Sequence, residues 1–182
     1  MAKGPAFERE VCRDLSLWFS GGKDDNWYWR TSNSGGRMTV RGRKGKSTRS
    51  HCGDICAIDP AGQALLDVIT WEVKRGYSGA TPFDILDKPI NGAEQEWEGW
   101  FSQARRSCKL AGTPYWMILA RRDRRTAVVW MPQKLWADLQ LSFMKGIAAM
   151  MLRIDGVTTC GMRLAEFFEH VTPDKVKELR RV

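Results

Sequence analysis

The sequence lacks any apolar run that approaches the roughly 18 residues a helix needs to cross a bilayer. The opening residues 1–5 lack the apolar segment of a signal peptide. Cysteine is sparse: five residues, an odd number at uneven spacings, favour free thiols over a disulfide framework. From these absences we expect a cytoplasmic protein, in a reducing compartment, with no membrane partner.

Acidic residues are in deficit, with 21 Asp and Glu against 29 Lys and Arg, which leaves a formal net charge of +8. That excess favours a polyanionic partner, either nucleic acid or an anionic membrane face. The composition, 43% hydrophobic and 27% charged, is that of a folded chain rather than a disordered one. No internal repeat and no linker divides the sequence, so we expect one domain over residues 1–182.

Acids are absent altogether from residues 37–49. This segment carries six basic residues, namely Arg37, Arg41, Arg43, Lys44, Lys46 and Arg49. A charge run is often only a solvated loop, but this density without acids favours phosphate binding, and we interpret it as a DNA-contacting segment. A second basic cluster, residues 121–125, joins two predicted strands.

Paired zinc-ligand motifs are also missing. His51, Cys52 and Cys56 lie close in sequence, but a structural zinc site usually takes four ligands from paired clusters, and no second pair follows downstream. We therefore expect these cysteines to be packed thiols.

Hydrophobic periodicity predicts a helix that opens at Gly4-Pro5, buries a stripe beginning at Phe7 and ends at Gly21-Gly22. Glu8 flanks that stripe, where a first-turn acid is also favoured by the helix dipole. A second helix is predicted over residues 94–111. The strands we expect are residues 27–31, 54–58, 65–75, 115–120, 126–131 and 148–154. Beyond them we expect a short helix after Pro132, a helix over residues 163–171 and a frayed tail after Pro173.

The strand over residues 65–75 contains Trp71-Glu72-Val73-Lys74. Because strand side chains alternate, Glu72 and Lys74 point to the same side. Charges on a largely apolar strand are costly to bury without a partner or a task. A hairpin about Ala61-Gly62 would bring Asp54 near Ile69 or Thr70, with Glu72 as a diagonal neighbour. Bringing both carboxylates to one metal then requires a bulge or bend near Gly53.

These residues suit metal-dependent phosphodiester hydrolysis. Hard cations such as Mg²⁺ prefer carboxylate and carbonyl oxygens, which Asp54, Glu72 and the Val73 carbonyl could supply. Glu8 could reach the metal from the first helix, and Lys74 could hold the attacking water or stabilise charge on the phosphate. The alternative is that Glu72 and Lys74 form a surface ion pair on an edge strand, which would contribute little to stability.

The pattern resembles the PD-(D/E)xK nuclease superfamily, and within it most resembles the archaeal-type Holliday junction resolvases. The opening helix with Glu8, the strand and loop Arg30-Thr31-Ser32-Asn33-Ser34-Gly35, and the motifs Gly53-Asp54-Ile55 and Glu72-Val73-Lys74 carry the resemblance. It covers about residues 4–131. Residues 132–182 have no counterpart in it and are taken as an extension of the same domain.

The resemblance implies an α/β, restriction-endonuclease-like core, α-β-β-β-α-β, with a mixed central sheet flanked by helices. It implies Asp54 and Glu72 as metal ligands, Lys74 as catalytic and Glu8 as an aid to the metal site. Ser32 or Ser34 becomes an active-site loop residue, and Gln103, with Gln95 as its competitor, a site glutamine. DNA contacts would come from Arg30, these loop and glutamine side chains, and the basic residues of 37–49.

It further implies a Mg²⁺- or Mn²⁺-dependent endonuclease without a small-molecule cofactor, acting as a homodimer on branched DNA. A virus or mobile element would suit such an enzyme. Alternatives are a nuclease for other DNA (nicking, restriction-like or end-processing), a non-catalytic DNA-binding protein with a nuclease-like fold, and an RNA-binding module. The last predicts stacking aromatics on an open sheet face and no need for metal.

Overall fold

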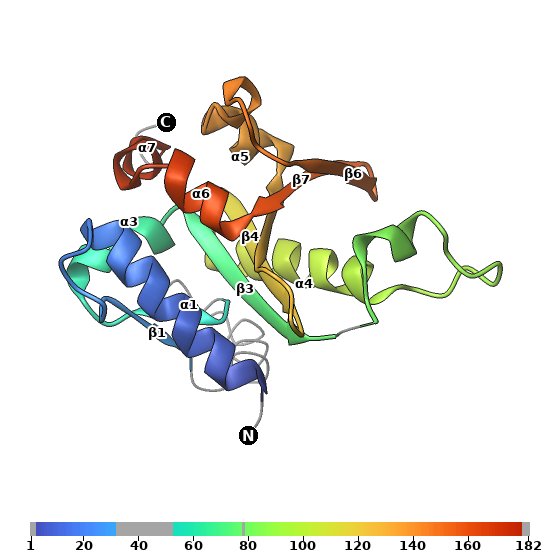
Figure 1. Cartoon of the computed structure of the whole chain (residues 1–182), viewed down its shortest axis with the longest axis horizontal. Coiled ribbons are helices and arrows are strands. Elements are labelled where there is room, and N and C mark those ends of the chain that lie inside the picture. The colour runs from blue at the N-terminus through green and yellow to red at the C-terminus, as the bar shows by residue number, and fades with distance from the viewer. Residues whose placement is uncertain (1–2, 32–52, 78, 180–182) are drawn as a thin grey trace.

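The computed structural model describes residues 3–31, 53–77 and 79–179 (Figure 1). The expected order α-β-β-β-α-β is confirmed. It comprises α1 (Lys3–Ser20), β1 (Tyr28–Arg30), β2 (Ile55–Ala57), β3 (Ile69–Gly76), α4 (Glu96–Ala111) and β4 (Tyr115–Arg122). The remaining elements are η1 (Pro60–Gly62), α3 (Gln63–Leu66), η2 (Pro82–Ile85), β5 (Val128–Pro132), α5 (Gln133–Asp138), η3 (Leu141–Phe143), β6 (Met150–Ile154), β7 (Val157–Arg163), α6 (Leu164–His170) and α7 (Pro173–Glu178).

The central sheet is mixed and has five strands in the order β3-β4-β5-β7-β6. Strand β3 pairs with β4 in parallel, and the other pairings are antiparallel. The parallel pair is connected through α4, as a parallel crossover requires. Helix α1 packs on one face of the sheet, in a core that includes Phe7, Leu15 and Trp71, whereas α4 packs on the other, with Phe101 and Trp130 (Figure 1).

The predicted hairpin between β2 and β3 is wrong. Strand β2 pairs antiparallel with β1, and the two form a separate two-stranded sheet. The Asp59-Pro60 signal starts a helical turn instead of a hairpin: the Asp59 carboxylate accepts from the Ala61 N–H, and proline suits a first helical position. Residues 63–66 then form α3, so β3 begins at Ile69 and not at residue 65.

The C-terminal part is more ordered than expected. Strand β7 was not predicted, and the frayed tail after Pro173 is wrong because α7 forms there. The Thr172 hydroxyl caps α7 by accepting from the Lys175 N–H, and Val176 is fully buried in the α1-side core. Within the described ranges, no helix combines the length and apolar composition that crossing a membrane requires.

Candidate active site

Strand β3 separates its side chains between the two cores. Trp71 and Val73 pack toward α1, whereas Glu72 and Lys74 face α4, so the predicted common orientation of the two charged side chains is confirmed. Strand β3 does lie at the edge of the five-stranded sheet. Glu72 is nevertheless only 1% exposed, which excludes the interpretation of a surface Glu–Lys pair.

The buried Glu72 carboxylate is held by side chains of α4 and β3. Its Oε1 accepts from the Ser107 hydroxyl at 2.7 Å, and its Oε2 accepts from Gln103 Nε2 at 2.7 Å and from Lys74 Nζ at 3.5 Å. Lys74 Nζ also donates to Gln103 Oε1 at 2.8 Å. Glu72, Lys74 and Gln103 thus close a three-membered loop of hydrogen bonds, and both oxygens of the Glu72 carboxylate accept hydrogen bonds.

Gly53 turns the chain so that Asp54 faces β3. Its φ is +85°, and a Cβ there would lie 2.4 Å from the Trp71 carbonyl oxygen, so only glycine fits. The Asp54 N–H donates to that same oxygen at 2.8 Å, and Asp54 Oδ2 accepts from the Val73 N–H at 2.8 Å. The bend predicted near Gly53 is therefore present, although it aligns β2 with β1 and not in a hairpin with β3.

Glu8 reaches the same region from α1. The Arg30 guanidinium of β1 donates to Glu8 Oε2 at 3.2 Å, and both side chains are partly buried. Burial, and then the negative charge of Asp54, raise the pKa of Glu8, while Arg30 opposes that rise. Glu8 is therefore an acid of α1 that experiences the negative charge of Asp54.

Glu72 experiences the same two effects more strongly. Burial, followed by the charge of Asp54, raises the pKa of Glu72 to about 7, against the opposing influence of Lys74 and Ser107. Repulsion between carboxylates in a water-poor site is the situation that a bound cation relieves. A strongly perturbed carboxyl beside a specific charge partner is also typical of functional sites.

The donor set suits a hard divalent cation. In the described ranges, no three Asp, Glu, His or Cys side chains form a cluster that could hold a metal by themselves. The nearby oxygen donors are the carboxylates of Asp54 and Glu72 with the carbonyl of Val73 between Glu72 and Lys74. Mg²⁺ is commonly bound through one or two carboxylates, with water and substrate phosphate completing its shell, so this smaller set fits.

A family model described as "Phage putative PDDEXK endonuclease" matches residues 1–178. The chain belongs to this phage PDDEXK endonuclease family. No curated protein matches it, and no solved structure does. The predicted PD-(D/E)xK membership is confirmed, and the match to the phage family also includes most of residues 132–182, for which the resemblance to resolvases offers no counterpart.

Membership makes the chain a nuclease whose substrate is DNA, in a superfamily that generally uses divalent metal ions. A phage family also fits the expected origin in a virus or mobile element. The archaeal-type resemblance was thus right at the level of the superfamily. The assignment of single residues to tasks within the endonuclease remains a prediction.

Of the two candidate glutamines, the fold brings Gln103 to Glu72 and Lys74. Gln95 instead precedes α4, where it takes part in a capping box with Glu98. Sequence reasoning missed Ser107, the donor to Glu72 Oε1. Its position one turn after Gln103 was a usable signal, because residues four apart share a helix face.

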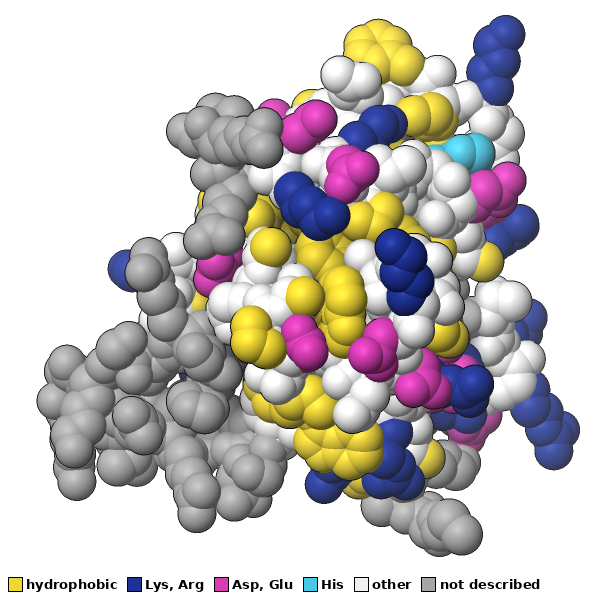
Figure 2. Space-filling view, turned by 90° about the vertical axis from the view of Figure 1, so that its left-hand side faces the viewer, with side chains coloured by type: hydrophobic (Ala, Val, Ile, Leu, Met, Phe, Trp, Pro, Cys, Tyr) yellow, Lys and Arg dark blue, Asp and Glu magenta, His cyan; other side chains and the backbone are white. Residues whose placement is uncertain are grey.

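The basic cluster of residues 121–125 is partly structural. Arg121 forms an ion pair with Glu10 and lies 4.2 Å over the Phe7 ring, while Arg75 donates to the Arg121 and Arg122 carbonyls. The exposed basic residues there are Arg124 and Arg125. Among the described side chains in the view of Figure 2, basic and acidic residues are interspersed.

Several predicted residues lie outside the described ranges. They are Ser32, Ser34, Arg37, Arg41, Arg43, Lys44, Lys46, Arg49, His51 and Cys52. Within the described ranges, Cys12, Cys56, Cys108 and Cys160 are free thiols. The Cys56 thiol donates to the Trp29 carbonyl at 3.3 Å.

Proposed function

We propose that this endonuclease hydrolyses DNA phosphodiester bonds at the site formed by Asp54, Glu72 and Lys74. The observation that carries the proposal is the hydrogen bond from the Val73 N–H to Asp54 Oδ2, at 2.8 Å, which fixes one carboxylate beside the strand that bears the other. Asp54, Glu72 and the Val73 carbonyl would hold Mg²⁺ or Mn²⁺. The bound ion would polarise a phosphoryl oxygen and acidify the attacking water.

Lys74 contributes a fixed positive charge. Its side chain is 12% exposed and its ammonium is restrained by Gln103 and Glu72, so little reorganisation is needed when charge develops on the phosphate. It can donate to a phosphate oxygen or hold the attacking water. Glu8 would assist at the edge of the site, where its ion pair with Arg30 restrains both side chains. The remaining Arg30 donors would contact the DNA backbone.

The DNA contacts would extend from Arg30 and Gln103 to Ser32, Ser34 and the basic residues of 37–49. For the substrate we propose branched DNA, with a Holliday junction as the leading form and a homodimer as the acting species. The support is the resemblance to resolvases together with the need for two active sites to make two symmetric nicks. The net charge of +8 supports a phosphate-rich partner without distinguishing its form.

The test is cleavage of a labelled four-way junction and of a matched linear duplex, with Mg²⁺, with Mn²⁺ and with EDTA. Paired nicks in the junction alone, abolished by EDTA and by Asp54→Asn, are the expected result. Cleavage of both DNAs would retain the nuclease site and reject the branch specificity. Binding without cleavage under either metal would overturn the catalytic proposal and favour a DNA-binding protein.

A further inference from the structure

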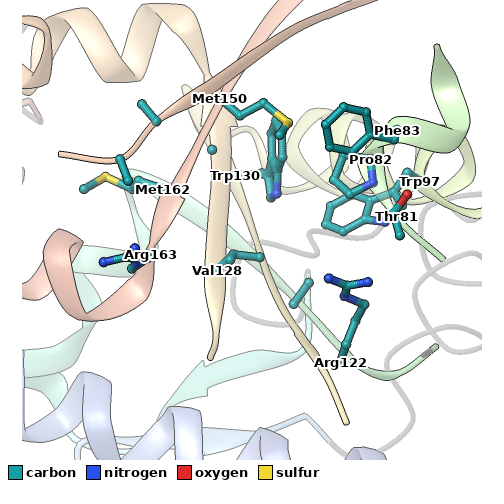
Figure 3. Close-up of a pocket in the computed structure, with 14 residues that line it drawn as sticks. Thr81, Pro82, Phe83, Trp97, Arg122, Val128, Trp130, Met150, Met162 and Arg163 are labelled. Carbon is teal, nitrogen blue, oxygen red and sulfur yellow. The ribbon is translucent and has the colours of Figure 1, made fainter. Parts of the chain in front are cut away.

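A cavity of about 390 Å³ opens on the α4 side of the sheet, within the size range of ligand pockets. Its walls come from η2, α4, β4, β5, β6 and β7, and include Phe83, Trp97, Trp130 and Met150 (Figure 3). The nuclease site described above uses none of these side chains. The lining side chains of the cavity are therefore separate from those of the nuclease site.

The cavity walls are aromatic and the only charges on them are positive. Among the described residues that line it there is no Asp or Glu, whereas Arg122 and Arg163 are present. Arg163 forms an ion pair with Glu166 at 3.1 Å. No ion pair or hydrogen bond joins the Arg122 guanidinium to another described side chain, and it points toward the aromatic end of the cavity (Figure 3).

Phe83 supplies an accessible ring at this end. It is 57% exposed, in contrast to Trp97 and Trp130, which are 3% exposed each. The η2 turn that carries it is fixed by a capping box, in which Asp84 accepts from the Thr81 N–H at 2.7 Å and from the Thr81 hydroxyl at 2.8 Å. A large apolar ring is thus presented to solvent on a defined turn, in the same cavity as the Arg122 guanidinium, which no described side chain pairs.

The cavity is next to the nuclease site on the same face. Ala120, which lines it, is the registered β4 neighbour of Lys74, and Arg122 is the neighbour of Gly76. Registered residues on adjacent strands are about 5 Å apart. On α4, Trp97 precedes Gln103 by six residues, a rise of about 9 Å. An occupant of the cavity would therefore be close to a phosphate positioned at Lys74.

We infer that this cavity binds an unpaired nucleotide of the DNA substrate, with its base against Phe83 and its phosphate at Arg122. The inference rests on the proposed function, because it takes DNA as the ligand. A base has an apolar face that stacks on aromatic rings without sequence preference, and a guanidinium matches phosphate geometry. Bases in duplex DNA are stacked and paired, so within branched DNA the cavity takes a nucleotide that is unpaired at the branch point, near the cut.

The test measures DNA binding in EDTA, where no cleavage occurs, by fluorescence anisotropy. Three DNAs are compared: a duplex with a short single-stranded flap, the same DNA with abasic nucleotides in the flap, and the continuous duplex. The wild-type protein should bind the flap about tenfold more tightly than its abasic version, the effect of one base–aromatic stack. Phe83→Ala should remove this difference, and Phe143→Ala, at an exposed phenylalanine outside the cavity, should keep it.

Arg122→Gln should weaken binding of the flap with and without its bases by the same factor, because it removes a phosphate contact. Equal wild-type affinity for the flap and its abasic version, or a base preference that survives Phe83→Ala, would overturn the inference. A third outcome would also overturn it: the wild-type protein shows no base preference and forms a concentration-dependent dimer, and Phe83→Ala dissociates that dimer. The cavity would then be the binding site for a second copy of the chain. Asp54→Asn should abolish cleavage and keep the base preference, so the two proposals can fail separately.

Discussion

Two polar clusters of this endonuclease contain the same kinds of group and differ in what surrounds them. At β3 and α4, Glu72 contacts Lys74 and its pKa is raised to about 7 by burial and by Asp54. At the other end of β4, the Asp138 carboxylate accepts from Lys134 and from the Tyr115 hydroxyl. There the hydrogen bond from Lys134, and next that from Tyr115, lower the pKa of Asp138.

The two clusters differ in how far the negative charge of the carboxylate is compensated by its neighbours. Lys134 is 71% exposed, and Asp138 faces one cation and no competing acid in its cluster. Glu72 is buried next to a second carboxylate, so its lysine and hydroxyl partners do not offset the cost of its charge. A carboxylate–lysine contact by itself is therefore uninformative. The uncompensated negative charge identifies β3 as the candidate for binding a cation and the Asp138 cluster as structural.

The largest expected effect follows from exchanging each lysine for methionine. Lys74→Met should lower the cleavage rate on the order of 10²- to 10³-fold, the cost of losing one preorganised charge at a developing oxyanion. Lys134→Met is the matched control and should leave cleavage unchanged. Single-turnover cleavage at saturating enzyme, with circular dichroism to confirm folding, provides the measurement. Similar losses in both variants would remove the distinction between the clusters.

The second prediction concerns stability against pH. The folded pKa of Glu72, about 7, lies above the ordinary value of 4.5, so its contribution is fully present below pH 4.5 and is lost as pH rises through 7. In metal-free protein, Glu72→Gln should therefore become more stable than wild type above pH 7, by on the order of 3 kcal/mol, and equal to it near pH 4.5. Denaturant unfolding across this range checks it.

For Asp138 the expected dependence of stability on pH has the opposite sign. Its folded pKa lies below the ordinary 3.8, so its contribution is present above pH 3.8 and is lost as pH falls through the lower folded value. Asp138→Asn should thus destabilise the protein at neutral pH.

A pH-independent difference in stability between wild type and Glu72→Gln would contradict the assignment of an uncompensated charge to Glu72. Adding Mg²⁺ to the wild type should recover stability above pH 7, because an ion that binds only the native state stabilises it.

The third prediction separates the two glutamines. Gln103→Ala removes contacts to both Glu72 and Lys74 and should lower cleavage about 10- to 100-fold, as expected for a group that orients catalytic side chains. Gln95→Ala, at the start of the same helix, should leave the rate close to wild type. A shifted pH–rate profile in Gln103→Ala, absent in Gln95→Ala, would identify a positioning effect on Glu72. If Gln103→Ala and Gln95→Ala have equal cleavage rates and equal pH–rate profiles, Gln103 does not position Glu72.

Much of the site could be predicted from sequence because local periodicity determines it. The alternation along β3 places Glu72 with Lys74, and Gly53 before an acid indicates a bend. The pairing of β2 with β1 could not be predicted, because strand pairing depends on non-local packing. The segment 65–69 is apolar except for Asp67 and is compatible with helix or strand, and the buried Leu65 and Leu66 belong to the helical turn α3.

Strand β7, which is missing from the sequence-based prediction, has a recognisable turn signal before it. Asp155-Gly156 joins β6 to β7 with φ values of +48° and +76°, the backbone that a two-residue hairpin with Asp-Gly prefers. Recognising it would have predicted β7. The α7 helix is different: its one buried apolar side chain, Val176, gains stability from the α1-side core, which propensity over six residues does not reveal.

The smallest expected effect tests the structural cluster directly. Tyr115→Phe removes a hydroxyl that donates to Asp138 and accepts from Lys134 at 2.9 Å, while the 2.6 Å pair between Lys134 and Asp138 remains. Because that pair is partly solvated, the loss should be about 1 kcal/mol of unfolding free energy. Cleavage should not change, since the cluster lies at the opposite end of β4 from Ala120, the neighbour of Lys74. Urea unfolding together with the single-turnover rate checks both parts, and a lower rate at unchanged stability would connect this end of the sheet to the active site.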